Sequence, residues 1–222
     1  MAIRTPIAQQ ASTERHCIFL LSPGNASGVK GQRLFNPDSQ FELALRLRES
    51  GAPLGAVYEF ISSLYFRGKL QYAEYFQCPP PGVAGVHVIT GAGLMLPDTV
   101  VSIDQFRRLS AIAIDADNPD YRLPLHRDLC RLQEVANSET NVILLGSIAT
   151  SKYITPLLSV FGEQLLFPRD FVGCGDMSRG SLLLKCCSSG SPLVYAPAAG
   201  LALNRKPTRK KLKKRLYISL SK

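Results

Sequence analysis

With 222 residues, of which 45% are hydrophobic, the chain is long and apolar enough to bury one large core. Its longest apolar runs, such as residues 142–145, are far shorter than the roughly 20 residues of a bilayer-spanning helix, so we expect no membrane span. Nine of the 26 basic residues lie between Asn204 and Lys222, and the rest of the chain has 17 basic and 17 acidic residues. The formal charge of +9 is therefore concentrated at one end.

This charge distribution suggests three parts: a flexible leader over residues 1–15, a single α/β domain over residues 16–203 and a basic tail over residues 204–222. The leader has no apolar core of signal-peptide length, which indicates a cytoplasmic protein. The tail is suited to attract RNA, DNA or anionic lipid through counterion release. It could equally serve only to keep the protein in solution, and both interpretations stay open.

Six cysteines and three histidines raise the question of disulfides or a bound metal. No two cysteines have the CxxC spacing, and no histidine lies close to a cysteine pair. We therefore expect reduced thiols, no metal site and no cofactor.

The first half of the chain reads as a strand, helices and a second strand. Residues 16–21 form a short apolar run ended by a Ser-Pro-Gly-Asn turn, which predicts a buried strand. Apolar residues at helical spacing predict helices over residues 40–49 and 54–65. The prolines of residues 79–82 end the following segment, and residues 86–90 predict the second strand.

A capped helix opens the next part. Ser102, with Gln105 three residues later, predicts a helix over residues 102–109, followed by a short edge strand over residues 111–114. Leucines at steps of three and four predict an amphipathic helix over residues 124–136, and residues 142–145 predict the third strand.

The last part predicts a helix over residues 155–161 and strands over residues 164–167, 182–185 and 193–196. Apolar strands that alternate with helices are typical of parallel strands buried on both faces. We therefore expect an α/β fold, a three-layer sandwich with a mainly parallel central sheet.

In such sheets ligands bind outside the carboxyl ends of the strands. Three predicted loops lie there, and two of them offer ligand-binding candidates: Asn25 in the glycine-rich residues 22–31, and Ser147, Thr150 and Lys152 after the third strand. The glycines of the first loop match neither a P-loop nor the GxGxxG spacing. A surface loop and ordinary helix capping are the alternatives.

Residues 90–99 form the third of these loops and contain Asp98. Its carboxylate could act as a general base or hold a ribose, or it could start a turn.

Aromatic and basic side chains alternate over residues 62–76, where Tyr65 and Arg67 suit base stacking and phosphate contact. Aromatic residues at helical spacing are also common in cores, so a structural role is the alternative.

Residues 171–186 place three glycines before Leu182-Leu183-Leu184. Because we expect a strand there, the glycines do not predict a dinucleotide-binding turn, which is followed by a helix. The loop instead presents Asp176, Ser178 and Arg179 as candidates, and Arg179 suits a forked contact with phosphate. An ion pair between Asp176 and Arg179 that only closes the turn is the alternative.

The run Leu64-Tyr65-Phe66-Arg67-Gly68-Lys69, with Thr90, Gly93-Leu94 and Pro97-Asp98-Thr99, resembles an uncharacterised family of bacterial proteins over residues 17–199. Over residues 58–104 it is more distantly similar to small α/β domains, some of which accompany 7-deazaguanine-type nucleic-acid modification enzymes and have a uracil-DNA-glycosylase-like shape. The resemblance implies an α/β fold and a connection with nucleotides or nucleic acids, and it assigns no activity.

Two functions from different classes remain. The first is binding of a nucleotide or nucleic acid at the strand ends, with hydrolase or glycosylase-like activity in which Asp98 and Asp176 are the candidate catalytic carboxylates. The second is a non-catalytic interaction module whose basic tail contacts nucleic acid or an acidic partner.

Overall fold

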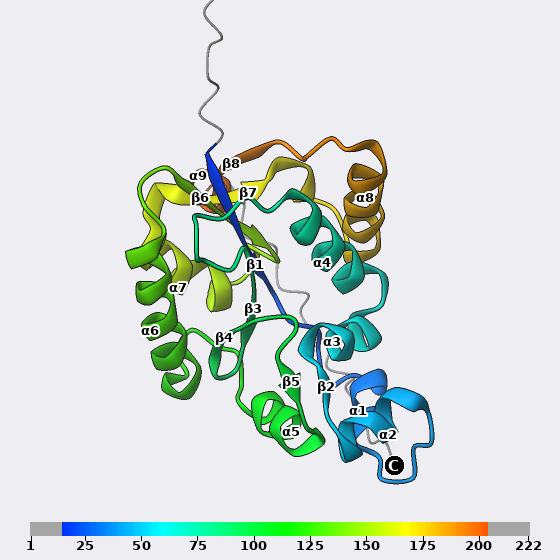
Figure 1. Cartoon of the computed structure of the whole chain (residues 1–222). Helices are drawn as coiled ribbons and strands as arrows, with labels where there is room; N and C mark the ends of the chain where they lie inside the picture. Colours follow the sequence, from blue (N-terminus) through cyan, green and yellow to red (C-terminus); the bar gives the residue numbers. More distant parts are fainter. Residues whose placement is uncertain (1–14, 204–222) are drawn as a thin grey trace, which may run out of the picture.

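A computed structural model of the protein describes residues 15–203 (Figure 1). The expected leader, apart from Arg15, and the expected basic tail lie outside these residues. The described part confirms the expected α/β fold, in which a mainly parallel sheet lies between two layers of helices. Among residues 15–203, no helix is long and apolar enough to cross a membrane.

The central sheet has six strands in the order β4-β3-β1-β6-β7-β8. Their bounds are β1 (His16–Leu21), β3 (Val86–Thr90), β4 (Gly93–Met95), β6 (Thr140–Leu145), β7 (Leu165–Pro168) and β8 (Tyr195–Pro197). The four inner strands are parallel, whereas the edge strands β4 and β8 are antiparallel to their neighbours. Residues 18–21 of β1 are buried because helices cover both faces of the sheet, which explains the unbroken apolar run.

Strand order reverses beside β1. The chain passes from β1 to β3 on one side and later returns to β6 on the other side. Leu21 pairs with Leu145, so Ser22 and Gly146 leave the sheet next to each other. In open α/β sheets this point is where ligands bind.

Helices cover both faces of the sheet (Figure 1). One face carries α4 (Leu64–Phe76) and α8 (Asp176–Ser189), and the other carries α6 (Pro119–Val135) and α7 (Ser151–Phe161). The helices α4 and α8 approach closely at two glycines, since a Cβ atom on Gly68 would lie 2.8 Å from the carbonyl oxygen of Gly180. The chain ends its described part in α9 (Ala198–Leu203), which packs near α7 and β7.

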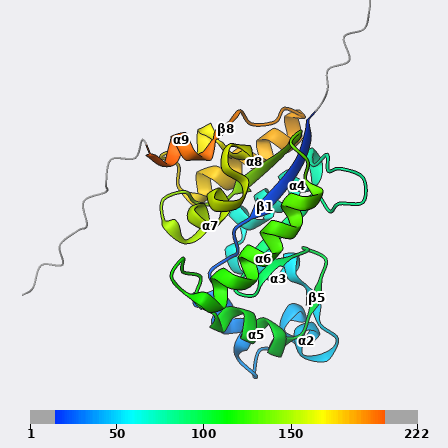
Figure 2. The same cartoon turned by 90° about the vertical axis from the view of Figure 1, so that its left-hand side faces the viewer.

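A smaller group of elements, here called the cap, lies beyond the carboxyl ends of the parallel strands (Figures 1 and 2). It consists of α1 (Val29–Phe35), α2 (Glu42–Glu49), α3 (Leu54–Ser62), α5 (Ile103–Ala111) and the short strands β2 (Ala52–Pro53) and β5 (Val100–Val101). Stacked rings join it internally, with Phe35 against Phe106 and Phe41 against Phe60. The predicted capping box is confirmed, because Ser102 and Gln105 exchange hydrogen bonds at the start of α5.

Several expected elements are confirmed, and others are wrong or shifted. The strands expected at residues 16–21, 86–90 and 142–145 are present, and the strand expected at residues 164–167 is shifted by one residue to Leu165–Pro168. No strand forms at residues 111–114, because Ala111 ends α5 and residues 112–114 follow it as a loop. The helix expected from residue 124 begins at Pro119, capped by Asn118. The helix expected from residue 155 begins at Ser151, and the last expected strand is shifted to Tyr195–Pro197.

The largest error concerns residues 182–185, which belong to helix α8 and not to a strand. The buried residues of α8, including Arg179, Gly180, Leu183 and Cys186, recur at helical spacing and face α4 and the core. A short apolar run does not by itself distinguish a strand from a buried helix segment. Gly190, in the left-handed conformation with φ of 66°, ends the helix.

Candidate functional site

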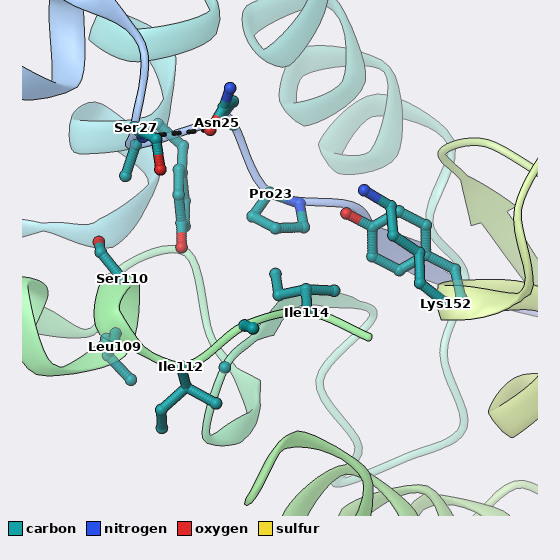
Figure 3. Close-up of a pocket in the computed structure, with 14 residues that line it drawn as sticks. Pro23, Asn25, Ser27, Leu109, Ser110, Ile112, Ile114 and Lys152 are labelled. Atoms are coloured by element: carbon teal, nitrogen blue, oxygen red, sulfur yellow. Dashed lines mark hydrogen bonds between the residues drawn. The ribbon is translucent and has the colours of Figure 1, made fainter. Parts of the chain in front are cut away.

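A pocket of about 390 Å³ lies between the carboxyl edge of the sheet and the cap (Figure 3). This volume is within the range of roughly 300–1,000 Å³ that is usual for small-molecule sites. The walls come from the loop after β1, from Tyr58 of α3, from Gly91 after β3, from residues 109–114 at the end of α5 and from the first turn of α7. We call it the strand-end pocket. Its lining residues are Pro23, Gly24, Asn25, Ala26, Ser27, Tyr58, Gly91, Leu109, Ser110, Ile112, Ala113, Ile114, Lys152 and Tyr153.

The pocket has a cationic side and a hydroxyl-bearing side. Figure 3 shows Lys152 on the opposite side from Ser27 and Ser110, with Pro23 and Ile114 between them. The lining contains one lysine and no aspartate or glutamate. Its fixed charge is therefore positive, which favours an anionic ligand.

Several polar groups of the lining have no protein partner within the described part of the chain. The Ser110 hydroxyl is buried there without a hydrogen bond. The hydroxyls of Tyr58 and Tyr153 make no hydrogen bond among the described residues, and Lys152 makes no ion pair with any of them. The Lys152 ammonium instead lies 5.0 Å from the centre of the Tyr153 ring. Unpaired donors of this kind are available to a ligand.

The hydroxyls of the two lining tyrosines are neutral. Burial raises the pKa of Tyr58 and of Tyr153 well above the ordinary value, because the phenolate is disfavoured in a poorly solvated site. The nearby Tyr153 raises the pKa of Tyr58 further, and the nearby Tyr65 raises the pKa of Tyr153 further. Both hydroxyls therefore remain protonated hydrogen-bond donors near neutral pH.

The loop after β1 has its shape from local contacts. The Asn25 side-chain oxygen accepts a hydrogen bond from the Ser27 N–H at 3.1 Å, and the Asn25 carbonyl accepts one from Gly28 at 3.3 Å. A Cβ atom on Gly31 would lie 1.9 Å from the carbonyl oxygen of Ala26, so glycine is required there for the loop to pack on α1. Gly31 thus helps to fix the shape of this loop by close packing.

A buried polar cluster lies behind this wall, between α4, α8 and the ends of β1 and β6. Lys69 of α4 donates hydrogen bonds to the Ser22 carbonyl and, at 3.0 Å, to the Ser22 hydroxyl. Tyr65 donates to the carbonyl of Gly146 at 3.2 Å, and Arg179 donates to the same carbonyl at 3.2 Å. The cluster therefore ties the two strand ends to the helices that cover them.

Lys69 is a buried cation of this cluster with a strongly lowered pKa. Burial lowers the pKa of Lys69 to about 7, an effect that Asp176 partly opposes and Arg179 reinforces. Arg179 is also buried, and its second guanidinium nitrogen donates to the carbonyl of Phe171 at 2.8 Å, whereas its Nε has no partner among the described residues. The Arg179 side chain is therefore held mainly by backbone carbonyls.

The structure places only two of the ten predicted site residues in the strand-end pocket, namely Asn25 and Lys152. Ser147 and Thr150 lie in the loop after β6 but outside the lining. The Ser147 hydroxyl accepts from the Ala149 N–H at 3.1 Å, and the exposed Thr150 precedes α7.

Tyr65 and Arg179 belong to the buried polar cluster, where each side chain donates a hydrogen bond to the backbone carbonyl of Gly146. Neither residue lines the strand-end pocket. Arg67 is exposed and lines a separate pocket with Lys30 and Glu59. The aromatic residues predicted for stacking are largely core residues, and Tyr58, which lines the strand-end pocket, was not among the predicted site residues.

The two predicted carboxylates do not share a site. Asp98 lies in the exposed loop between β4 and β5 and lines a different pocket. Asp176 is the exposed first residue of α8, and its carboxylate lies 4.0 Å from the Arg179 guanidinium. The ion pair that was the alternative for these two residues is therefore present, at a long distance. Ser178 is exposed on the same helix. None of these three residues lines the strand-end pocket.

Sequence reasoning missed Tyr58, Ser110, Tyr153 and Lys69. The first three belong to helices, and only tertiary packing brings them to the strand ends. Lys69 carried a usable signal, because it is the one charged residue on the face of α4 that also carries Tyr65, Phe66 and Tyr72.

Comparison with known proteins finds no match for this chain among protein-family models, curated proteins or solved structures. The resemblance described above therefore stays a prediction. Within residues 15–203, no group of three or more histidine, cysteine, aspartate or glutamate side chains is arranged to hold a metal ion.

Proposed function

We propose that the protein binds a phosphate-bearing nucleotide of about mononucleotide size in the strand-end pocket. The observation that carries the proposal is the combination of one unpaired lysine, three hydroxyls without protein partners and no carboxylate in a pocket at the strand-order reversal.

The cationic side suits the phosphate. Lys152 lies in the first turn of the 11-residue helix α7, where the helix dipole adds to its positive charge. The Thr150 side chain does not cap this helix, so the first backbone N–H groups of α7 remain available. A phosphate on this side would gain charge-assisted hydrogen bonds without displacing a protein carboxylate.

The opposite side suits a ribose and base. Ser27 and Ser110 offer hydroxyls that donate and accept, and Asn25 offers an amide. The apolar side chains of Leu109 and Ile112 add a surface for a flat heterocycle. The lining has no carboxylate, histidine or cysteine to act as a general base or nucleophile, so the proposal is one of binding.

Calorimetric titration with the four ribonucleoside 5′-monophosphates, and with the corresponding nucleosides, tests the proposal. We expect at least one monophosphate to bind, and Lys152→Met to weaken that binding by about tenfold or more, because a charge-assisted hydrogen bond is worth roughly 1.5–3 kcal/mol. Nucleoside binding should change little. Lys185→Met, which alters an exposed lysine of α8, is the matched control. Absence of monophosphate binding, or equal affinities for both variants, would contradict the proposal.

Ser110→Ala provides a second and sharper test. Removal of a buried hydroxyl without a partner should raise the free energy of unfolding of the unliganded protein by about 1 kcal/mol. The same change should weaken nucleotide binding several-fold, because the hydroxyl then no longer contacts the ligand. A gain in stability together with a loss of affinity indicates a group kept for binding. A variant with unchanged affinity would show that Ser110 is no part of the site.

A further inference from the structure

Lys69 is a buried lysine with an unusual set of partners. Its side chain is 1% exposed, and its ammonium group contacts the carbonyl and hydroxyl of one residue, Ser22. The remaining contacts are the ring faces of Tyr65 and Phe66, whose centres lie 4.6 and 4.9 Å from Nζ. Lysines are almost never fully buried unless they are paired, and no carboxylate forms an ion pair with Lys69 in the described residues.

Stability alone does not explain this lysine. Burying an ammonium group costs several kcal/mol, and an apolar side chain of similar length would fill the same space without that cost. The charged groups that face Lys69 do not remove the cost, because Asp176 of α8 is exposed and Arg179 of α8 is a second cation. Tyr65 of its own helix faces it as a neutral phenol whose pKa is raised by burial.

The partner of Lys69 is the residue that joins β1 to the strand-end pocket. Ser22 is followed directly by Pro23–Ser27, the five consecutive lining residues of the first wall. Its N–H bonds to the Leu145 carbonyl at 3.1 Å, and a Cβ atom on Gly146 would lie 3.0 Å from its own Cβ. The backbone of Ser22 is thus fixed on the β6 side, and Lys69 fixes it on the α4 side.

We infer that Lys69 is a positioning residue of the strand-end pocket, which holds the first wall in its binding conformation through Ser22. The inference rests on the proposed nucleotide site for its effect on affinity. It does not need Lys69 to touch the ligand.

The protonation of Lys69 makes this role visible in a pH profile. The charged ammonium donates three hydrogen bonds and binds Ser22 more strongly than the neutral amine, which donates two. An anionic ligand near the wall also favours the charged form. The advantage of Lys69 for nucleotide binding should therefore decrease as the pH rises from 6 to 8.5. Ionisation of the nucleotide phosphate is common to all variants and cancels in the ratio of their affinities.

The test compares the wild-type protein, Lys69→Met and the control Lys185→Met in two measurements. Calorimetry with the four ribonucleoside 5′-monophosphates should show Lys69→Met binding about tenfold more weakly at pH 6, and less than threefold more weakly at pH 8.5. Amide hydrogen exchange without ligand should become faster at Ser27 and Gly28, whose N–H groups bond to Asn25, and stay unchanged in β6. Ser22→Ala, which keeps the carbonyl acceptor, should give a smaller effect of the same kind.

The outcomes separate the two proposals. Equal affinity and equal exchange in wild type and Lys69→Met would overturn the inference about Lys69, even if nucleotides bind. If no monophosphate binds the wild type, the proposed function fails, and exchange at Ser27 and Gly28 still decides whether Lys69 holds the wall. If Lys69→Met does not fold, Lys69→Gln replaces it, because its neutral amide keeps an N–H donor group but does not titrate. A ratio of wild-type to Lys69→Gln affinity that is the same at pH 6 and pH 8.5 then overturns the inference.

Discussion

Replacement of Lys69 by methionine should change how the stability of the protein depends on pH. In the folded protein the pKa of Lys69 is about 7, whereas an unfolded chain has the ordinary lysine value near 10.4. Between these values the unfolded state holds a proton that the folded state has released. Stability contributed by this group therefore rises with pH above 7, and below pH 7 both states are protonated and the contribution is constant.

The magnitude follows from proton linkage. One proton of difference between the two states changes the free energy of unfolding by about 1.4 kcal/mol per pH unit. Between pH 7 and 8.5 the wild type should therefore gain roughly 2 kcal/mol relative to Lys69→Met. At pH 6.5 Lys69→Met should be the more stable protein, because it buries no charge.

Urea unfolding at four pH values from 6 to 8.5 measures this difference for both proteins. Other groups also titrate, since burial raises the pKa of Cys186 and Cys187 and lowers the pKa of His87. These groups are common to both proteins and cancel in the comparison. Parallel stability curves for wild type and Lys69→Met over this range would refute the assignment of a buried lysine that is largely neutral above pH 7.

Two further predictions concern packing and hydrogen bonding. Gly68→Ala should lower the free energy of unfolding by about 1–3 kcal/mol in urea titrations, because the new Cβ would lie 2.8 Å from a backbone oxygen of α8. Gly200→Ala, whose Cβ would meet no atom within 4 Å in helix α9, should cause no loss of stability. Tyr72→Phe should lower the free energy of unfolding by about 1–3 kcal/mol in the same assay, because the buried N–H of Leu193 donates to the Tyr72 hydroxyl at 2.8 Å and would lose its acceptor. Tyr75→Phe, at an exposed tyrosine, should have little effect. Equal losses for the two variants would contradict this account.

The sequence was most informative where local pattern and burial agree. Residues 18–21 and 142–145 are apolar throughout, and residues 86–90 are mainly apolar, because both faces of a parallel strand are covered. These runs predicted the sheet. The capping box of Ser102 and Gln105 was predictable because it depends only on a spacing of three residues.

Local pattern was misleading where the environment decides. The run Leu182-Leu183-Leu184 is compatible with a strand and with a helix, and contact with α4 through the glycines at 68 and 180 makes it part of a helix. The helix starting at Asp176 turns Arg179 inward, toward the carbonyls of Gly146 and Phe171. The neighbouring glycines had instead predicted that Arg179 lies in a loop.

The sequence by itself determined the fold class and the edge of the sheet at which a ligand is expected, because strand periodicity and loop composition are local properties. It placed Asn25 and Lys152 at that edge, where both line the strand-end pocket. Only the tertiary structure brought Tyr58, Ser110 and Tyr153 to the same pocket, and only it buried Lys69 against Ser22. These contacts join residues far apart in the chain, and their partners and burial are set by how the helices pack on the sheet and not by neighbours in the sequence.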